Sequence, residues 1–187
     1  MSINIIKPRT MEKQIYVAFL RGINVGGHHK VPMADLKETF KKMGLNPIKT
    51  VLNSGNILFE AGNESTETLE KSIEVRLEKS FGFFIPVLIT TLVNIQDIIA
   101  TNPFKDIAVH KDIRLYVTFT KKTITAAVDL PRVSDDGYFQ IIGTGEKVVY
   151  SVLDVSKAKT TNAMEMLEKI YGKDITTRNW NTLLKIA

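Results

Sequence analysis

The chain has 187 residues, of which 44% are apolar, and it carries a formal net charge of +5 at pH 7. This length allows one domain of ordinary size or two small ones, and the apolar content predicts a packed core rather than wholesale disorder. The sequence holds no cysteine, which excludes disulfides, thiol catalysis and cysteine-bound zinc, and we expect a reducing, cytoplasmic setting. No stretch approaches the roughly 18 apolar residues that a membrane span needs, so no membrane association is expected.

Residues 1–13 are interpreted as an N-terminal extension, because they show no clear hydrophobic period. An apolar run over 15–20 then predicts a strand. The loop 21–32 follows, with the sequence Arg-Gly-Ile-Asn-Val-Gly-Gly-His-His-Lys-Val-Pro. After the loop, apolar residues at helical spacing predict a helix over 33–43.

Two strand-like runs, 48–52 and 57–61, flank the hairpin signal Asn53-Ser54-Gly55-Asn56. A second helix is expected from Thr66 to Gly82, with acidic residues in its first turn, where the helix dipole favours them. A strand over 84–90 and a short helix capped by Thr91 complete this part of the chain. The pair Asn102-Pro103 stops helices and marks a boundary.

The pattern apolar-Tyr-Val-x-Phe at 15–19 returns at 115–119. The second copy is predicted to lie in a strand over 112–120, followed by a short helix over 124–128 and a hairpin of 138–142 and 147–153. A helix is then expected from about Asn162, with Glu165 in a capping box, and a strand over 174–176. A last helix is capped by Thr177, and the residues that share one of its faces are Trp180, Leu183, Leu184 and Ala187. Each half therefore has the order β-α-β-β-α-β with a trailing helix. The predicted fold is α+β, with two tandem ferredoxin-like halves, 14–102 and 103–187, each built on an antiparallel sheet.

This topology brings the 21–32 loop and the 53–56 turn to the same end of the first half. The two segments would form a rim that is rich in hydrogen-bond donors and free of acids. Its candidate ligand-binding residues are Arg21, Asn24, Lys30, Asn53, Ser54 and Asn56. A strand-to-helix loop of this kind is a common place for α/β proteins to hold an anion. The alternative is that these glycines and asparagines serve only the turns themselves.

Established motifs do not fit the loop. Gly22 and Gly27 have the spacing of a phosphate-binding P-loop, but His28 and His29 replace the lysine and hydroxyl residue that it requires. Ser54 and a histidine would be candidates for a nucleophilic pair, yet no nucleophile-elbow signature is present. No metal site and no cofactor are predicted, and the catalytic residues are unknown.

The stretch 176–182 is the second unusual segment. Arg178 and Asn179 are predicted to lie in the first turn of the last helix, where free backbone N–H groups attract anions, and we include them among the candidate ligand-binding residues. Trp180 is expected to pack in the core.

Three segments, 16–33, 53–56 and 176–182, together resemble a family of bacterial proteins known as domain of unknown function, family 1697. The resemblance implies a two-part α/β fold of duplicated ferredoxin-like character in a cytoplasmic protein, without an established activity. Members of that family often carry Lys-Asn where this chain has His28-His29. This departure argues against a histidine as the shared chemical group, and favours Arg21, Lys30 and the other polar residues of the rim.

The sequence leaves three functions open, with no oligomeric state assigned. The first is binding of a phosphate-bearing small molecule or of nucleic acid at the basic, Gly-rich rim, supported by the net charge and by a sheet order shared with RNA-binding domains. Tyr16 and Phe19 differ in parity, so at most one of them could face an open sheet. The alternatives are a small enzyme acting on an anionic metabolite and a protein–protein interaction module.

Overall fold

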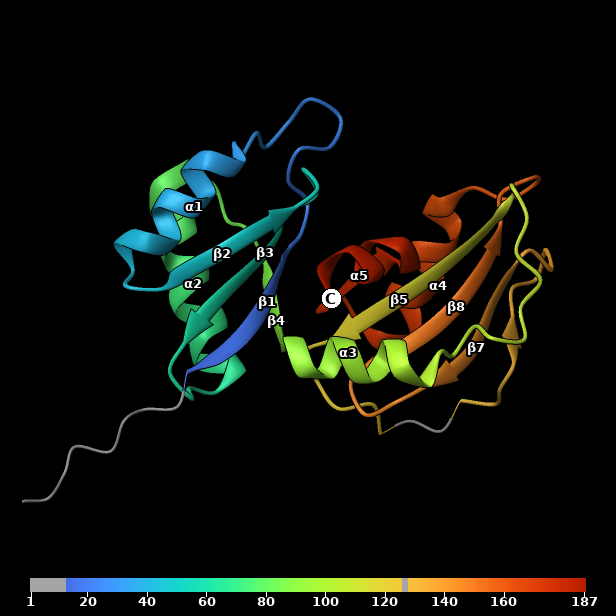
Figure 1. Ribbon diagram of the computed structural model, residues 1–187. Helices are drawn as coiled ribbons and strands as arrows, with labels where there is room; N and C mark the ends of the chain where they lie inside the picture. Colours follow the sequence, from blue (N-terminus) through green and yellow to red (C-terminus); the bar gives the residue numbers. More distant parts are fainter. Residues whose placement is uncertain (1–12, 126–127) are drawn as a thin grey trace, which may run out of the picture.

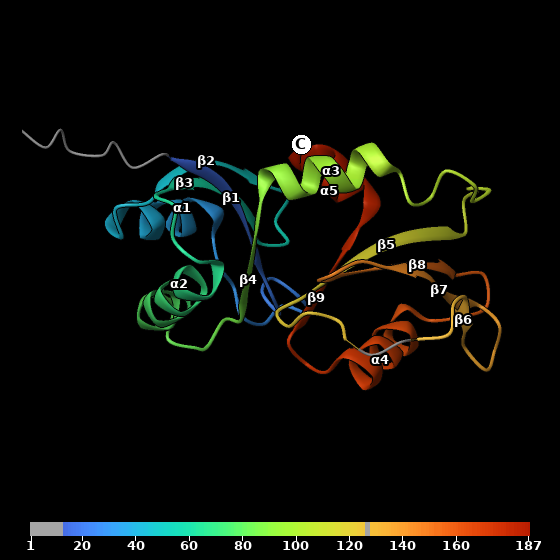
Figure 2. The ribbon, with the colours of Figure 1, turned by 90° about the horizontal axis from the view of Figure 1, so that it is seen from below.

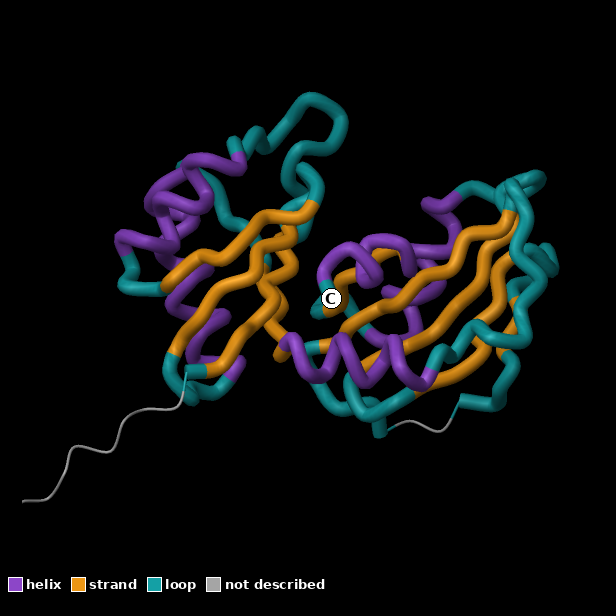
Figure 3. The backbone as a smooth tube through the Cα atoms, viewed as in Figure 1, coloured by secondary structure: helices purple, strands orange, loops and turns teal. Residues whose placement is uncertain are grey.

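The structure is a computed structural model that describes residues 13–125 and 128–187. In those residues it contains five helices and two antiparallel sheets, which form the mixed α+β architecture seen in Figures 1 and 3. Apart from Lys13, the expected N-terminal extension lies outside the described residues.

The first sheet has the strand order β2-β3-β1-β4. Its strands are β1 (Gln14–Leu20), β2 (Asn46–Val51), β3 (Asn56–Ala61) and β4 (Val87–Thr91). Two helices, α1 (Met33–Lys42) and α2 (Thr66–Phe81), cover one face of this sheet, because apolar residues recur at helical spacing along each of them. Their fully buried residues are Leu36, Phe40, Leu69, Ile73 and Leu77.

The second sheet has the strand order β6-β7-β8-β5-β9. Its strands are β5 (Ile113–Thr120), β6 (Arg132–Val133), β7 (Phe139–Thr144), β8 (Val148–Asp154) and β9 (Ile175–Asn179). The helix α4 (Thr160–Tyr171) covers one face, where Ala163 and Leu167 pack against inward residues of β7 and β8.

The remaining helices, α3 (Leu92–Thr101) and α5 (Trp180–Ile186), pack against each other in the space between the two sheets (Figure 2). They contribute Ile95, Ile98, Leu183 and Ile186 to an apolar cluster that also contains residues of both sheets. The rings of Phe19 in β1 and Phe119 in β5 stack within this cluster, with their centroids 4.9 Å apart. The two sheets therefore share a hydrophobic core.

This shared core covers the face of the first sheet that an RNA-binding domain of similar strand order would leave open. Tyr16 points into the core under α1 and α2, and Phe19 points into the core between the sheets. Both residues are at most 1% exposed. The sheet-surface argument for nucleic acid is therefore wrong for this molecule, because α3 and α5 occupy that surface.

The structure of the second part differs from the prediction at two elements. Ile124, Thr125 and Val128 belong to no helix, and residues 126–127 lie outside the described residues. The backbone N–H of Ile124 instead donates to the carbonyl of Glu146, 2.7 Å away, so this segment is tied to the β7–β8 hairpin. The short strand β6 was not predicted, since two residues carry too little pattern.

The starts of the last two helices also differ. α4 begins at Thr160, two residues before Asn162, and its N-cap Lys159 makes no side-chain cap, so the predicted capping box is wrong. α5 begins after Asn179, because pairing with β5 extends β9 through Thr177 to that residue. The buried face of α5 is consequently formed by Thr182, Leu183 and Ile186, whereas Leu184 is 47% exposed.

Candidate functional site

The structure brings the 21–32 loop and the 53–56 turn together, as the sequence argument expected. The N–H of Leu20, at the end of β1, donates to the carbonyl of Gly55 at 2.8 Å. The side-chain amide of Asn24 donates to the carbonyl of Asn53 at 2.9 Å. The loop and the turn are therefore one surface feature.

Asn24 fixes the shape of the loop. Its Nδ2 donates to the carbonyl of Val31 and its Oδ1 accepts from the N–H of Val31, at 3.0 and 2.8 Å. Its backbone is left-handed, with φ of 56°, a conformation that asparagine tolerates better than most residues. Ile23 and Val31 are buried and anchor the two ends of the loop in the core. The polar groups of Asn24 are thus engaged by the protein's own backbone.

The two histidines of the loop lie in different environments. The ring of His29 stacks on Phe83, with centroids 4.4 Å apart, and its Nδ1 lies 3.3 Å from the carbonyl oxygen of Gly22. His28 instead borders a hollow of about 470 Å³ on the outer side of the loop, which we call the loop hollow. The residues that line the loop hollow are Asn24, Gly27, His28, Lys30, Val31, Pro32, Met33 and Asn53.

Arg21 lies on the opposite side of the loop and is paired with an acid. Its guanidinium donates to the carboxylate of Glu168 in α4 and to the carbonyl of Lys173. The predicted acid-free rim is therefore wrong at Arg21. The carboxylate belongs to a residue 147 positions later in the chain, so no local sequence pattern could have predicted this ion pair.

Arg178 joins the second sheet to the rim. Its Nε donates to Oδ1 of Asn56 at 2.6 Å, and its Nη2 donates to the carbonyl of Leu20 at 2.8 Å. The guanidinium also lies over the ring of Phe19, 5.0 Å from its centroid. Burial lowers the pKa of Arg178 to about 10. Its donors are directed at protein acceptors, so Arg178 supports the rim from beneath.

The other predicted residues lie in different surroundings. Ser54 borders, with Arg21 and Arg178, a smaller hollow of about 260 Å³ on the α4 side of the loop. Asn56 is fully buried, and its Nδ2 donates to the carbonyl of Val51 at 2.7 Å. Asn179 is the N-cap of α5, where its side chain accepts from the N–H of Asn181 at 3.0 Å. Of the eight predicted residues, Asn24, Lys30 and Asn53 border the loop hollow.

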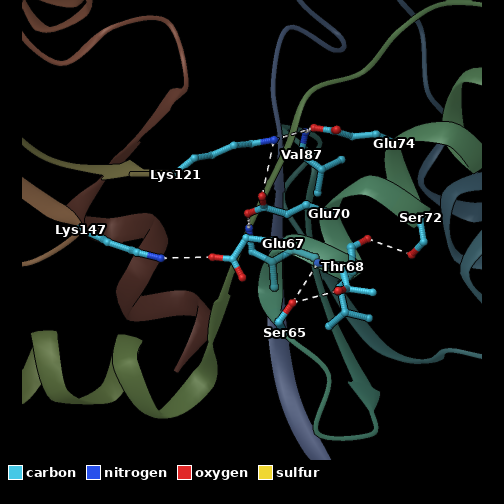
Figure 4. Close-up of polar contacts among 11 residues, drawn as sticks. Ser65, Glu67, Thr68, Glu70, Ser72, Glu74, Val87, Lys121 and Lys147 are labelled. Atoms are coloured by element: carbon cyan, nitrogen blue, oxygen red, sulfur yellow. Dashed lines mark hydrogen bonds and ion pairs between the residues drawn. The ribbon is translucent and has the colours of Figure 1, made fainter. Parts of the chain in front are cut away.

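A polar cluster that the sequence analysis missed lies between the two sheets, where Lys121 and Lys147 point toward carboxylates on α2 (Figure 4). The Nζ of Lys121 lies 2.8 Å from Glu74 and 3.5 Å from Glu70. Lys147 lies 3.3 Å from Glu67. The spacing of the three glutamates in the sequence places them on one face of a helix, which could have been predicted. The lysines that pair with them come from distant parts of the chain and could not be inferred from that spacing.

Burial and pairing shift the pKa values in this cluster. Burial raises the pKa of Glu70, against the opposing effects of the Ile89 N–H group and of Lys121. Burial alone would lower the pKa of Lys121, but its hydrogen bond to Glu74 and the charges of Glu70 and Glu74 outweigh burial and raise it. The cluster is therefore a partly buried set of ion pairs that joins α2 to the second part of the chain.

Within residues 13–125 and 128–187, no group of three or more histidine or acidic side chains is placed to hold a metal ion. None of the helices in that part of the chain has the length and apolar character required to cross a membrane.

Two antiparallel sheets with a shared core, and a glycine-rich loop fixed to a neighbouring turn, define the α+β class of this protein. Residues 13–150 match the family described as "Protein of unknown function (DUF1697)", and the chain belongs to that family. The structure of the conserved bacterial protein SP0830 from Streptococcus pneumoniae is similar, with a TM-score of 0.69 and 24% sequence identity. The similarity covers 94% of this chain and 97% of that one, and at this identity it shows the fold alone. No curated protein matches the chain.

Proposed function

We propose that this protein binds a small phosphate-bearing ligand in the loop hollow. The observation that carries the proposal is the composition of the hollow: its lining contains Lys30 and His28 and no carboxylate. Lys30 is exposed and, among the described residues, is in no ion pair, so its ammonium group is available to an anion. An anion there would gain a charge-assisted hydrogen bond without displacing a protein carboxylate.

The backbone around the hollow supports the same chemistry. Helix α1 starts at Met33, which lines the hollow, and its N-cap Pro32 makes no side-chain hydrogen bond, so no side chain of the N-cap occupies the first N–H groups of the helix. Gly26 and Gly27 have positive φ, and nothing lies within 4 Å of where a Cβ would stand on either residue. A ligand could therefore approach the backbone of the loop closely. Asp35 is the one acid in the first turn of α1 and does not line the hollow.

A small ligand is favoured over nucleic acid because the rim has few basic groups that are not already engaged by the protein. Arg21 is engaged by Glu168, and Arg178 by acceptors within the protein. Nucleic-acid binding depends on many phosphate contacts along an extended basic surface. The volume of the loop hollow instead falls within the roughly 300–1,000 Å³ that is typical of small-molecule sites.

The test is an NMR titration of the ¹⁵N-labelled full chain with inorganic phosphate and with glycerol 3-phosphate, using glycerol as the uncharged control. We expect saturable shifts of the amides of Gly27, His28 and Met33 with both anions and none with glycerol. Lys30→Ala should weaken binding by about tenfold, the effect of one charge-assisted hydrogen bond. The matched variant Lys42→Ala, at the exposed end of α1, should bind like the parent.

The proposal fails if neither anion moves those amides, or if Lys30→Ala binds as tightly as the parent protein. A parallel titration with single-stranded RNA at two salt concentrations separates the competing function. If the parent binds RNA in a salt-dependent way, loses that binding in Lys30→Ala, and does not bind phosphate, the ligand of the loop hollow is nucleic acid rather than a small molecule.

At the level of the fold, we propose that segments 14–102 and 103–187 are two ferredoxin-like halves that arose by duplication of one unit. Support comes from the strand orders β2-β3-β1-β4 and β7-β8-β5-β9, in which corresponding strands occupy corresponding places. The absence of cysteine from the sequence agrees with the cytoplasmic setting that we propose.

A further inference from the structure

A second hollow, of about 370 Å³, lies between the edge strands of the two sheets, β4 and β9, and is separate from the loop hollow. We call it the seam pocket. Its apolar lining is formed by Phe19, Phe84, Pro86, Val87, Leu88 and Ile175. An apolar pocket at the junction of two structural units, with a few polar groups directed into it, is the usual form of a small-molecule site.

Ion pairs border the pocket on two sides. The first is formed by Lys121 with Glu74 and Glu70, and the second by Arg21 with Glu168. The carboxylates of the first pair are also held by backbone N–H groups: Val87 donates to Glu74 at 2.9 Å, and Ile89 donates to Glu70 at 2.8 Å. These acids are therefore held by a cation and by backbone donors.

Two further charged side chains of the lining, Lys173 and Asp174, are exposed, and we call their side of the pocket its mouth. Lys173 lines the pocket, is exposed, and forms no ion pair within the described part of the chain. Asp174, the next residue, is the one carboxylate of the lining that has no cationic partner among the described residues. Phe84 is 56% exposed, which is unusual for a phenylalanine. An exposed aromatic ring and an unpaired ammonium group thus lie around the same opening.

Arg21 is engaged by Glu168, and Lys121 is engaged by Glu74 and Glu70. Among the described residues, Lys173 and Asp174 are the two charged side chains of the lining outside these ion pairs. We propose that the seam pocket binds a small organic anion whose aromatic body packs on Phe84 and the apolar lining, and whose carboxylate lies beside Lys173. Burial of the flat body supplies most of the affinity, and Lys173 sets the preference for an anion.

The experiment uses the full chain and two probes of nearly equal shape, naphthalene-2-carboxylate and the neutral naphthalene-2-carboxamide. Each is titrated into ¹⁵N-labelled protein, and dissociation constants are taken from the amide shifts. We expect the carboxylate to shift the amides of Phe84, Ile175 and Thr176 saturably, and to bind about tenfold more tightly than the carboxamide, since only the carboxylate gains a charge-assisted hydrogen bond.

Variants locate the ligand and its charge. Lys173→Ala should abolish the preference, so that the carboxylate and the carboxamide bind with about equal affinity. Asp174→Asn should increase the preference, because it removes a negative charge that repels the carboxylate of the probe. Phe84→Ala should weaken both probes equally. The matched exposed controls, Lys71→Ala on α2 and Val93→Ala on α3, should leave both constants unchanged.

Three outcomes would overturn the proposal. Equal affinity for the two probes would make the pocket a purely apolar site. If Asp174→Asn bound the carboxylate more weakly than the parent does, the pocket would not be a site that prefers anions. Shifts confined to the 21–33 amides would move the ligand to the loop hollow.

Discussion

At the scale of single residues, the contact between the loop and the turn depends on Gly55. Its φ is +76°, and a Cβ built there would lie 2.7 Å from Cδ1 of Ile23 and 2.8 Å from Cβ of Leu20. A real Cβ does not approach other carbon atoms so closely. Gly55 therefore serves two purposes: it allows the left-handed backbone of the turn, and it lets the turn close against the base of the loop.

We expect Gly55→Ala to lower the free energy of unfolding by about 3 kcal/mol, combining left-handed strain with overpacking of the buried Ile23. Urea denaturation measures this change. Gly26→Ala is the matched control, because it has a φ of +60° and open space around the position, and it should lose only about 1 kcal/mol from strain. Equal losses in the two variants would show that packing at Gly55 has no effect.

At the scale of elements, helix α2 protects the edge of the first sheet. β4 is an edge strand, and unpaired edge N–H groups invite pairing with other chains. Glu74 and Glu70 accept from the N–H groups of Val87 and Ile89, so α2 satisfies the edge of β4 with side chains. Lys121 then pairs with both carboxylates from the side of the second sheet. The same three charges thus cover an edge and connect the two sheets.

This arrangement makes stability depend on pH through Glu70. Its pKa is raised above the ordinary value of 4.5, mainly by burial. At a pH between 4.5 and the folded-state pKa, the folded state therefore keeps a proton that the unfolded state has released. The contribution of Glu70 to stability is fully present below pH 4.5 and is lost as the pH rises through the folded-state pKa. We expect the unfolding free energy of the parent, relative to that of Glu70→Gln, to fall as the pH increases from 4 to 8.

Urea titrations of both proteins at each pH provide the measurement. Glu67→Gln is the control of opposite sign. The pKa of Glu67 is lowered, first by its backbone hydrogen bond and then by Lys147, so its contribution is present above pH 4.5 and is lost as the pH falls. If the two differences had the same slope, burial of Glu70 would not control its protonation.

At the scale of the whole molecule, the two sheets are joined by a hydrophobic core rather than by ion pairs alone. The cluster between them contains Phe19 and Leu58 from the first sheet and Val117 and Phe119 from the second. Large hydrophobic interfaces oppose independent motion of the units they join. The polar contacts of Arg21, Arg178 and Lys121 then fix how the sheets meet at the surface.

We therefore expect one cooperative unfolding transition for the whole chain, in which fluorescence of Trp180 and far-UV circular dichroism change together. Phe119→Ala should lower the unfolding free energy by about 3–5 kcal/mol and keep the two signals coincident. Val133→Ala, at an exposed position of β6, should change stability by no more than about 0.5 kcal/mol. Separate transitions for the two signals would show that the sheets unfold independently.

The strength of the local signal decides how much could be predicted. Strands 15–20 and 57–61, and the helix from Thr66, were predicted within about one residue, because several turns or alternations of pattern support each of them. The helix expected over 124–128 and the cap at Thr177 rested on only a few residues. At Thr177, pairing with β5 outweighed the local preference, and its hydroxyl instead lies 2.8 Å from that of Thr118.

The sequence by itself determined the order of the elements in the first part, most of the order in the second, and the meeting of the 21–32 loop with the 53–56 turn, since these follow from local periodicity and from the reversal of direction at each connection. Only the tertiary structure decided that Glu168 pairs with Arg21, that Asn56 and Leu20 hold Arg178, and that α3 and α5 lie between the sheets. These contacts join residues far apart in the chain. Their formation depends on how complete surfaces fit together, which no local pattern encodes.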